Sequence, residues 1–311
     1  MQLKWLQKIP LWRLIGPAVV IAAVFWVGPG KVWAALSKAD FRFVAAACFM
    51  AVPLSLIKGI RWKTLLQGYG IDLSFRDSTG MYAVGMVLAA VTPGRVGDFV
   101  KIVMLIKKGC TTGKAIAANI FDRLFDVGFI LLAGYCGMWY FSENFVSQLN
   151  VINIVFGASL VLLVIFVLKG HVVKRVAIKF VPAGYRPAAR QSWNEIVAGF
   201  LKNRISRFFW IIFWTVVFWL LQFYAIYLCS LALGVGISFI YLIACAAVAA
   251  VLSLLPITVA GLGTRDAVFI LLLGQIGIAR QQSLALSALV LAVFLVNCAV
   301  FYVISVVFKS D

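Results

Sequence analysis

Residues 283–308 read SLALSALVLAVFLVNCAVFYVISVVF, a run of 26 positions without a charged side chain. An α-helix needs about 20 consecutive apolar residues to cross the hydrocarbon core of a bilayer, so this run predicts a transmembrane helix. Further apolar stretches of similar length lie at 12–29, 41–58, 115–141, 151–168 and 207–231. A transmembrane β-barrel would show short alternating segments instead of continuous apolar ones. The sequence therefore predicts an all-α polytopic membrane protein with about six full transmembrane helices.

The composition of the whole chain agrees with this class. Of its 311 residues, 64% are hydrophobic and 12% are charged, whereas soluble domains are about half apolar and about a quarter charged. These values exclude an ordinary soluble globular domain, a disordered chain and a small disulfide-rich module. The six cysteines are scattered without CxxC spacing, so we expect neither a metal site nor a cofactor.

The chain is strongly basic, with 28 Lys and Arg against 10 Asp and Glu and a formal net charge of +18. Most basic residues lie between the apolar stretches, as is typical of cytoplasmic loops that face anionic lipid. No RNA-recognition, zinc-finger or helix-turn-helix pattern accompanies them, so nucleic acid is not an expected partner. Membrane lipids are the partners that this charge distribution favours.

Proline and glycine interrupt two further apolar stretches, 79–106 and 239–273. The residues at these breaks are Pro93, Gly94 and Gly97 in the first and Pro256, Gly261 and Gly263 in the second. Proline removes a helical hydrogen bond, and glycine allows the chain to leave helical geometry. Several arms beside the breaks are short for a full crossing, which favours two re-entrant helical hairpins.

Loop charge gives the expected orientation of these elements. Residues 169–207 carry nine Lys or Arg against the single acidic Glu195, so this loop should be cytoplasmic. Counting helices in both directions then places both termini on the cytoplasmic side of the inner membrane. The two hairpins take opposite orientations, as in transporters built from inverted repeats. Three basic residues within 30–42, which this topology places outside, argue against it.

We expect a single integral membrane domain over 1–311, built from two halves. The first half, 1–168, contains the hairpin 79–106, and the second half, 207–311, contains the hairpin 239–273. The connector 169–206 is basic, and its apolar residues recur at helical spacing. It is therefore predicted to be an amphipathic helix on the inner leaflet that joins the halves.

Eight ionisable residues fall within segments that the apolar pattern places in the membrane. They are Arg95, Asp98, Lys101, Asp122, Arg123, Asp126, Arg265 and Asp266. A charged group near the bilayer centre costs about 3 kcal/mol or more unless it is paired or hydrated, so a functional role is the default hypothesis. Helical spacing favours pairing of Asp98 with Lys101 and of Arg123 with Asp126, and it places Asp122 on the same face as Asp126.

Two interpretations fit these charges, whose formal sum is zero. In the first, the groups neutralise one another and fix the packing of the helices. In the second, the four cations and the glycines of both breaks form a site for an anionic head group, because arginine and helix amino termini suit phosphate oxygens. The four aspartates then pair with these cations, and one of them could take up a proton during transport. Asp98 and Asp266 could equally cap helices. We favour the functional site.

Three segments resemble the flippase-like transmembrane region of lysylphosphatidylglycerol synthases. They are TPGRVGDFVKIVML (92–105), NIFDRLFDV (119–127) and LLPITVAGLGTRDAVFILLLG (254–274). The resemblance extends over nearly the whole chain, but Asp98 and Asp266 stand where glutamate is expected and Lys101 where arginine is common. It implies movement or presentation of lipids such as phospholipids, hopanoid-type lipids or polyprenyl-phosphate-linked sugars. The chain ends at Asp311, directly after its last predicted helix, so synthase activity is not implied.

A flippase-like lipid translocase is the function that these observations favour. One alternative is a non-transporting accessory subunit that holds an enzyme of a lipid-modifying or lipid-glycan pathway at the membrane. Another is an intramembrane enzyme that uses an aspartate pair. Arg123 and Lys101 oppose the enzyme, because neighbouring cations keep carboxylates ionised and prevent them from sharing a proton.

Overall fold

The computed structural model describes residues 29–141, 157, 205–253 and 263–308. Its helices are α2 (Pro29–Leu36), α3 (Phe41–Phe49), α4 (Ala51–Gly68), α5 (Phe75–Val91), the 3₁₀ helix η3 (Pro93–Phe99), α6 (Val100–Lys107), α7 (Thr112–Tyr140), α11 (Ile205–Ala232), α12 (Phe239–Leu252), α13 (Thr264–Gln275) and α14 (Arg280–Val307). Helices and the turns between them make up these ranges, without a strand. The predicted all-α class is confirmed.

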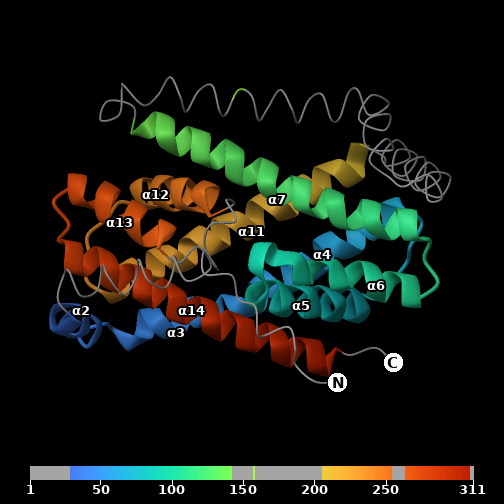
Figure 1. Cartoon of the computed structure of the whole chain (residues 1–311), viewed down its shortest axis with the longest axis horizontal. Helices are drawn as coiled ribbons and strands as arrows, with labels where there is room; N and C mark the ends of the chain where they lie inside the picture. The colour runs from blue at the N-terminus through green and yellow to red at the C-terminus, as the bar shows by residue number, and fades with distance from the viewer. Residues whose placement is uncertain (1–28, 142–156, 158–204, 254–262, 309–311) are drawn as a thin grey trace.

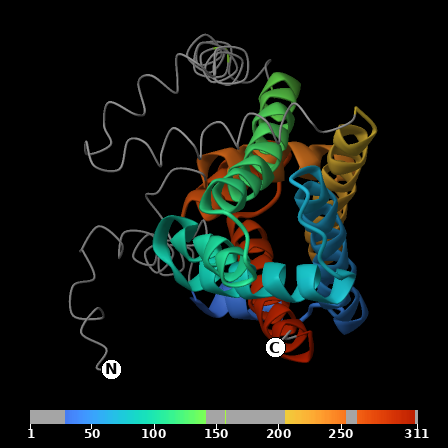
Figure 2. The same ribbon diagram turned by 90° about the vertical axis from the view of Figure 1, so that its right-hand side faces the viewer.

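Long helices run along the molecule, and shorter ones gather at its two ends. In Figure 1, α7 and α14 extend along most of the length, with α12 and α13 near one end and α5 and α6 near the other. The main contacts join α7 to α12, α5 to α4 and α14, and α11 to α3 and α4. Figure 2 shows α4 lying beside α11. Helix α5 also packs on η3, which contains the first predicted break. This break therefore lies at the end of the molecule that holds α5 and α6 (Figure 1).

Apolar side chains fill the space between these helices and also cover much of the outside. One buried cluster includes Leu242 and Phe269, and another includes Trp62 and Leu105. Many large apolar side chains are exposed; among them are Trp139, Phe209, Leu295 and Tyr302. Exposed apolar surface of this extent is typical of helices that face lipid.

Within the part of the chain that the structure describes, three helical segments have the length and hydropathy required to cross a membrane: Phe41–Gly68, Ser206–Ala232 and Arg280–Val307. They correspond to the predicted helices 41–58, 207–231 and 283–308. The first prediction is wrong at its carboxyl end, because the helix continues through Lys58 and Arg61 to Gly68. A charged residue does not end a helix when a partner in another helix neutralises it, and both cations have such partners.

The remaining predicted helices have different outcomes. The stretch 115–141 is helical and corresponds to α7, although α7 is not among the three candidate membrane-crossing segments. The predicted helices 12–29 and 151–168 and the connector 169–206 lie outside the described residues, apart from Pro29 at the start of α2, Gly157 and the start of α11 at Ile205. The number of crossings and both re-entrant hairpins therefore stay predictions.

The first break is formed as the sequence predicts. Helix α5 ends at Val91, and Pro93 begins η3, in which the backbone N–H of Gly97 donates to Thr92 Oγ1 at 2.7 Å. A Cβ on Gly97 would overlap the backbone of Leu88, so only glycine lets η3 approach α5 this closely. At the second break α12 ends at Leu252 and α13 begins at Thr264, while Pro256 and Gly261 lie outside the described residues.

Candidate functional site

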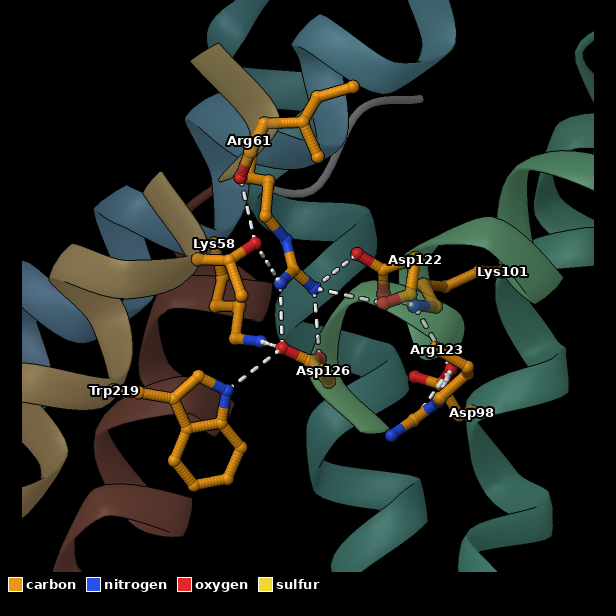
Figure 3. A network of polar contacts seen from close by, with 10 residues as sticks. Lys58, Arg61, Asp98, Lys101, Asp122, Arg123, Asp126 and Trp219 are labelled. Atoms are coloured by element: carbon orange, nitrogen blue, oxygen red, sulfur yellow. Dashed lines mark hydrogen bonds and ion pairs between the residues drawn. The ribbon is translucent and has the colours of Figure 1, made fainter. Parts of the chain in front are cut away.

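Seven charged side chains meet where α4, η3, α6 and α7 come together (Figure 3). We call this group the charged cluster; its members are Lys58, Arg61, Asp98, Lys101, Asp122, Arg123 and Asp126. Six of these residues are buried, and the side chain of Arg123 is 25% exposed. The cluster brings together five of the predicted site residues, from η3, α6 and α7, with two cations from α4.

Arg61 binds both carboxylates of α7. Its Nη1 donates to Asp126 Oδ1 at 2.6 Å, and its Nη2 donates to Asp122 Oδ1 at 2.5 Å and to Asp126 Oδ2 at 2.9 Å. Nη1 also donates to Thr215 Oγ1 on α11 at 3.1 Å. Asp122 and Asp126 share a helical face, as their spacing of four residues predicts. One planar guanidinium therefore holds α4, α7 and α11 together.

Asp126 is also bound by two other groups. Lys58 Nζ donates to both of its carboxylate oxygens at 2.7 Å, and Trp219 Nε1 of α11 donates to Oδ1 at 3.3 Å. The same ammonium lies 3.8 Å from the ring centroid of Phe218, close enough for a cation–π contact. Asp126 is thus fixed by helices α4 and α11.

Lys101 and Arg123 share the carboxylate of Asp98. Lys101 Nζ lies 3.0 Å from Asp98 Oδ2 and 3.1 Å from Asp122 Oδ2, with the ring centroid of Tyr82 at 4.3 Å. Arg123 Nε donates to Asp98 Oδ2 at 2.8 Å, and Nη2 of the same guanidinium is 2.7 Å from that oxygen. The predicted pair of Asp98 with Lys101 is formed, whereas Arg123 binds Asp98 on η3 rather than Asp126 on its own helix.

Four cations face three carboxylates in the charged cluster. The cations are Lys58, Arg61, Lys101 and Arg123, and the anions are Asp98, Asp122 and Asp126. Among the described residues no other charged side chain forms an ion pair with the cluster, which leaves a formal surplus of one positive charge. An unbalanced charge in a buried site is costly, and an anion would offset it.

Lys58 and Arg61 are the site residues that sequence reasoning missed. Basic residues were expected mostly in loops between the apolar stretches, yet these two lie within α4 and are 2% and 0% exposed. Two signals could have found them: they are three residues apart, and apolar residues continue beyond them at helical spacing to Leu65 and Leu66. An apolar pattern that persists past a charge indicates that the helix, and the burial, persist as well.

The other predicted site residues lie elsewhere. Arg265 Nε donates to Ser287 Oγ of α14 at 2.8 Å, and its Nη2 donates to the Ser287 carbonyl at 3.0 Å. Asp266 Oδ2 accepts the backbone N–H of Gly263 at 2.7 Å, so the predicted helix-capping role of Asp266 is formed. Pro93, Gly94 and Arg95 belong to η3, but their side chains are not among those described. The zero charge sum of the predicted set therefore does not apply to the charged cluster.

The arrangement of the carboxylates bears on the aspartate-pair enzyme. Asp122 and Asp126 are each bound by at least two cationic or N–H donors, with Arg61 bound to both. A catalytic aspartate dyad shares one proton between carboxyl groups that approach each other directly. Here cations lie between the carboxylates, and they favour the ionised form of each.

The family model described as the lysylphosphatidylglycerol synthase TM region matches residues 13–304. The chain belongs to this family. The predicted resemblance is confirmed, and together with the apolar helices the match identifies a multi-pass membrane protein.

Three relatives of the chain are UPF0104 membrane proteins. A UPF0104 membrane protein of Pyrococcus horikoshii is 32% identical over 163 residues, which cover 50% of this chain and 47% of that protein. One from Methanothermobacter thermautotrophicus is 27% identical over 199 residues, or 63% of this chain and 54% of that protein. These matches span about half the length of the two relatives. A UPF0104 membrane protein of Methanocaldococcus jannaschii is 22% identical over 307 residues, which cover 91% of this chain and 90% of the relative.

Proposed function

We propose that the protein is a lipid translocase of the inner membrane that binds an anionic or phosphate-containing head group at the charged cluster. The observation that carries this proposal is the surplus positive charge of the cluster, buried in a protein whose outer surface is largely apolar. Arginine presents several N–H donors in one plane, which suits the oxygens of a phosphate. Arg123 is the cation through which a head group would enter, because its side chain is the most exposed of the seven.

The surface beside Arg123 favours a lipid over a small soluble anion. On η3 the apolar side chains of Val96 and Phe99 are 59% and 53% exposed, on either side of the buried Asp98. A charged contact next to exposed apolar surface suits a molecule with a polar head and a hydrocarbon tail. Phospholipids, hopanoid-type lipids and polyprenyl-phosphate-linked lipids all meet this description.

Proton coupling is part of the proposal. A carboxylate whose cation turns to the head group becomes under-neutralised and could take up a proton during transport. Asp98, Asp122 and Asp126 have such cations within the cluster. A pH gradient across vesicles should then change the rate of transport, and a rate indifferent to the gradient would exclude proton coupling.

The alternative of an accessory subunit rests on the aromatic surface of α11. Phe209, Trp210 and Phe213 are 62%, 46% and 40% exposed, and they contact one another through stacked or edge-on rings. Such a surface could bind a membrane-embedded enzyme, although aromatic residues also face lipid at the membrane interface. A translocase requires the charged cluster for its activity, whereas a scaffold does not.

Replacing Arg123 by glutamine is expected to reduce head-group translocation by roughly 10-fold to 100-fold, because a hydrogen-bonded contact to a charged group contributes about 1.5–3 kcal/mol. The measurement is the movement of labelled anionic phospholipids between leaflets of proteoliposomes, relative to protein-free vesicles. The matched control is Lys107→Gln, which removes one exposed positive charge from α6 outside the cluster. Absence of protein-dependent movement across a broad lipid panel would support the accessory subunit instead.

A further inference from the structure

We infer that the charged cluster selects lipid head groups with a single negative charge, and that the head group displaces Asp98 from Arg123. This inference rests on the proposed function and specifies its substrate class. A monoanion exactly offsets a surplus of one positive charge, whereas a head group with two or more charges leaves a negative excess in a buried site. A zwitterionic head group leaves the surplus unbalanced.

The geometry around Asp98 keeps the free-energy cost of this exchange low. Both contacts of Arg123 go to one oxygen, Oδ2, at 2.8 and 2.7 Å, and Lys101 Nζ binds the same oxygen at 3.0 Å. When a phosphate oxygen takes the place of Asp98 at Arg123, Lys101 remains as an ion-pair partner of the carboxylate, which has then lost one of its two cations. None of the other cations has to move, since Lys58 and Arg61 bind Asp122 and Asp126 instead.

Several buried polar atoms near this exchange, Arg123 Nη2 among them, form no hydrogen bond with the described residues. Asp98 Oδ1 accepts no hydrogen bond there, and the hydroxyl of Tyr82, a residue that is 1% exposed, makes none. The ring of Tyr82 lies 4.3 Å from Lys101 Nζ, next to the carboxylate that would move. Buried polar groups are normally satisfied, so these atoms are consistent with a site completed by a bound polar group.

The test is competitive binding to the purified full chain in nanodiscs, read by displacement of a fluorescent phosphatidylglycerol. The competitors are phosphatidylglycerol, with one negative charge, diacylglycerol pyrophosphate, with at least two, and zwitterionic phosphatidylcholine. We expect the wild type to prefer phosphatidylglycerol over the pyrophosphate lipid by about tenfold, the ratio that corresponds to about 1.4 kcal/mol. Soluble glycerol phosphate should not displace the probe; if it does so as well as the lipid, the site recognises a free phosphate instead.

The decisive variant is Asp98→Asn, which keeps the side-chain shape and raises the surplus to two positive charges. We expect it to shift the preference by about tenfold toward the pyrophosphate lipid, as Coulomb interactions in a poorly hydrated site require. Arg123→Gln, which removes the surplus, should bind phosphatidylglycerol no better than phosphatidylcholine, and Lys107→Gln should behave like the wild type. Thermal unfolding establishes that each variant is folded, and Arg123→Gln alone tests charge matching if Asp98→Asn does not fold.

Two failures are distinguishable. If anionic lipids bind better than phosphatidylcholine but Asp98→Asn and Arg123→Gln leave every preference unchanged, charge selection by the cluster is wrong and the proposed function stands. If the wild type binds no anionic lipid better than phosphatidylcholine, the proposed function itself is wrong.

Discussion

Arg61→Leu is expected to destabilise the protein by about 3–5 kcal/mol, because it removes from a buried ion-pair network the cation that binds both Asp122 and Asp126. Arg61 is fully buried and donates to Asp122, Asp126 and Thr215. Without it, Asp122 retains only the Lys101 ammonium as an ion-pair partner among the described side chains. The leucine also cannot form the hydrogen bonds by which the Arg61 guanidinium connects α4 to α7 and α11.

The measurement is thermal unfolding of the purified protein in detergent, with Lys107→Gln as the control that changes the net charge equally. A double variant, Arg61→Leu with Asp122→Asn, also removes a carboxylate that has lost its guanidinium partner and should recover part of the loss. Unfolding of Arg61→Leu at the same temperature as the control would contradict the account of the buried network.

Gly97→Leu is the second substitution with a large expected effect, a loss of about 1–3 kcal/mol from overpacking together with loss of lipid movement. A Cβ at this position would overlap the backbone of Leu88, so η3 must move away from α5. Asp98 is the next residue, and its displacement would separate it from Lys101 and Arg123. The loss of lipid movement should therefore be larger than the decrease in the amount of folded protein alone would produce.

Gly128→Leu is the matched control, because a Cβ at Gly128 of α7 has no atom of another described residue within 4 Å. Unfolding temperature and lipid movement are measured for both variants. Equal behaviour of Gly97→Leu and Gly128→Leu would mean that the contact between η3 and α5 is not required.

Local patterns predicted much of the fold. Continuous apolar stretches gave the helices around 41–58, 207–231 and 283–308, and Pro93 gave the end of α5 and the start of η3. These features depend on length, hydropathy and backbone chemistry, which are properties of the segment itself. The carboxyl end of α4 was mispredicted, because the burial of Lys58 and Arg61 depends on carboxylates 61 to 68 residues away along the chain.

The candidate site was also predicted only in part, because local spacing determines which residues share a helical face but not how helices pack. Helical spacing correctly placed Asp122 and Asp126 on one face and paired Asp98 with Lys101. It could not show that Arg123 binds Asp98 across two elements, nor that Arg265 contacts α14, because both depend on how helices pack. The net charge of the site depends on this packing. Its surplus of one positive charge appears only when Lys58 and Arg61 of α4 are counted.

An anionic head group that binds at Arg123 in the charged cluster would lie beside η3 and α7. The most direct test is photolabelling in proteoliposomes with a phosphatidylglycerol that carries a diazirine next to its head group, followed by mapping of the labelled peptides. We expect adducts on η3 and on α7 around Arg123, reduced about tenfold in Arg123→Gln and unchanged in Lys107→Gln. Adducts that concentrate on α13 around Arg265, or that persist undiminished in Arg123→Gln, would contradict binding at Arg123.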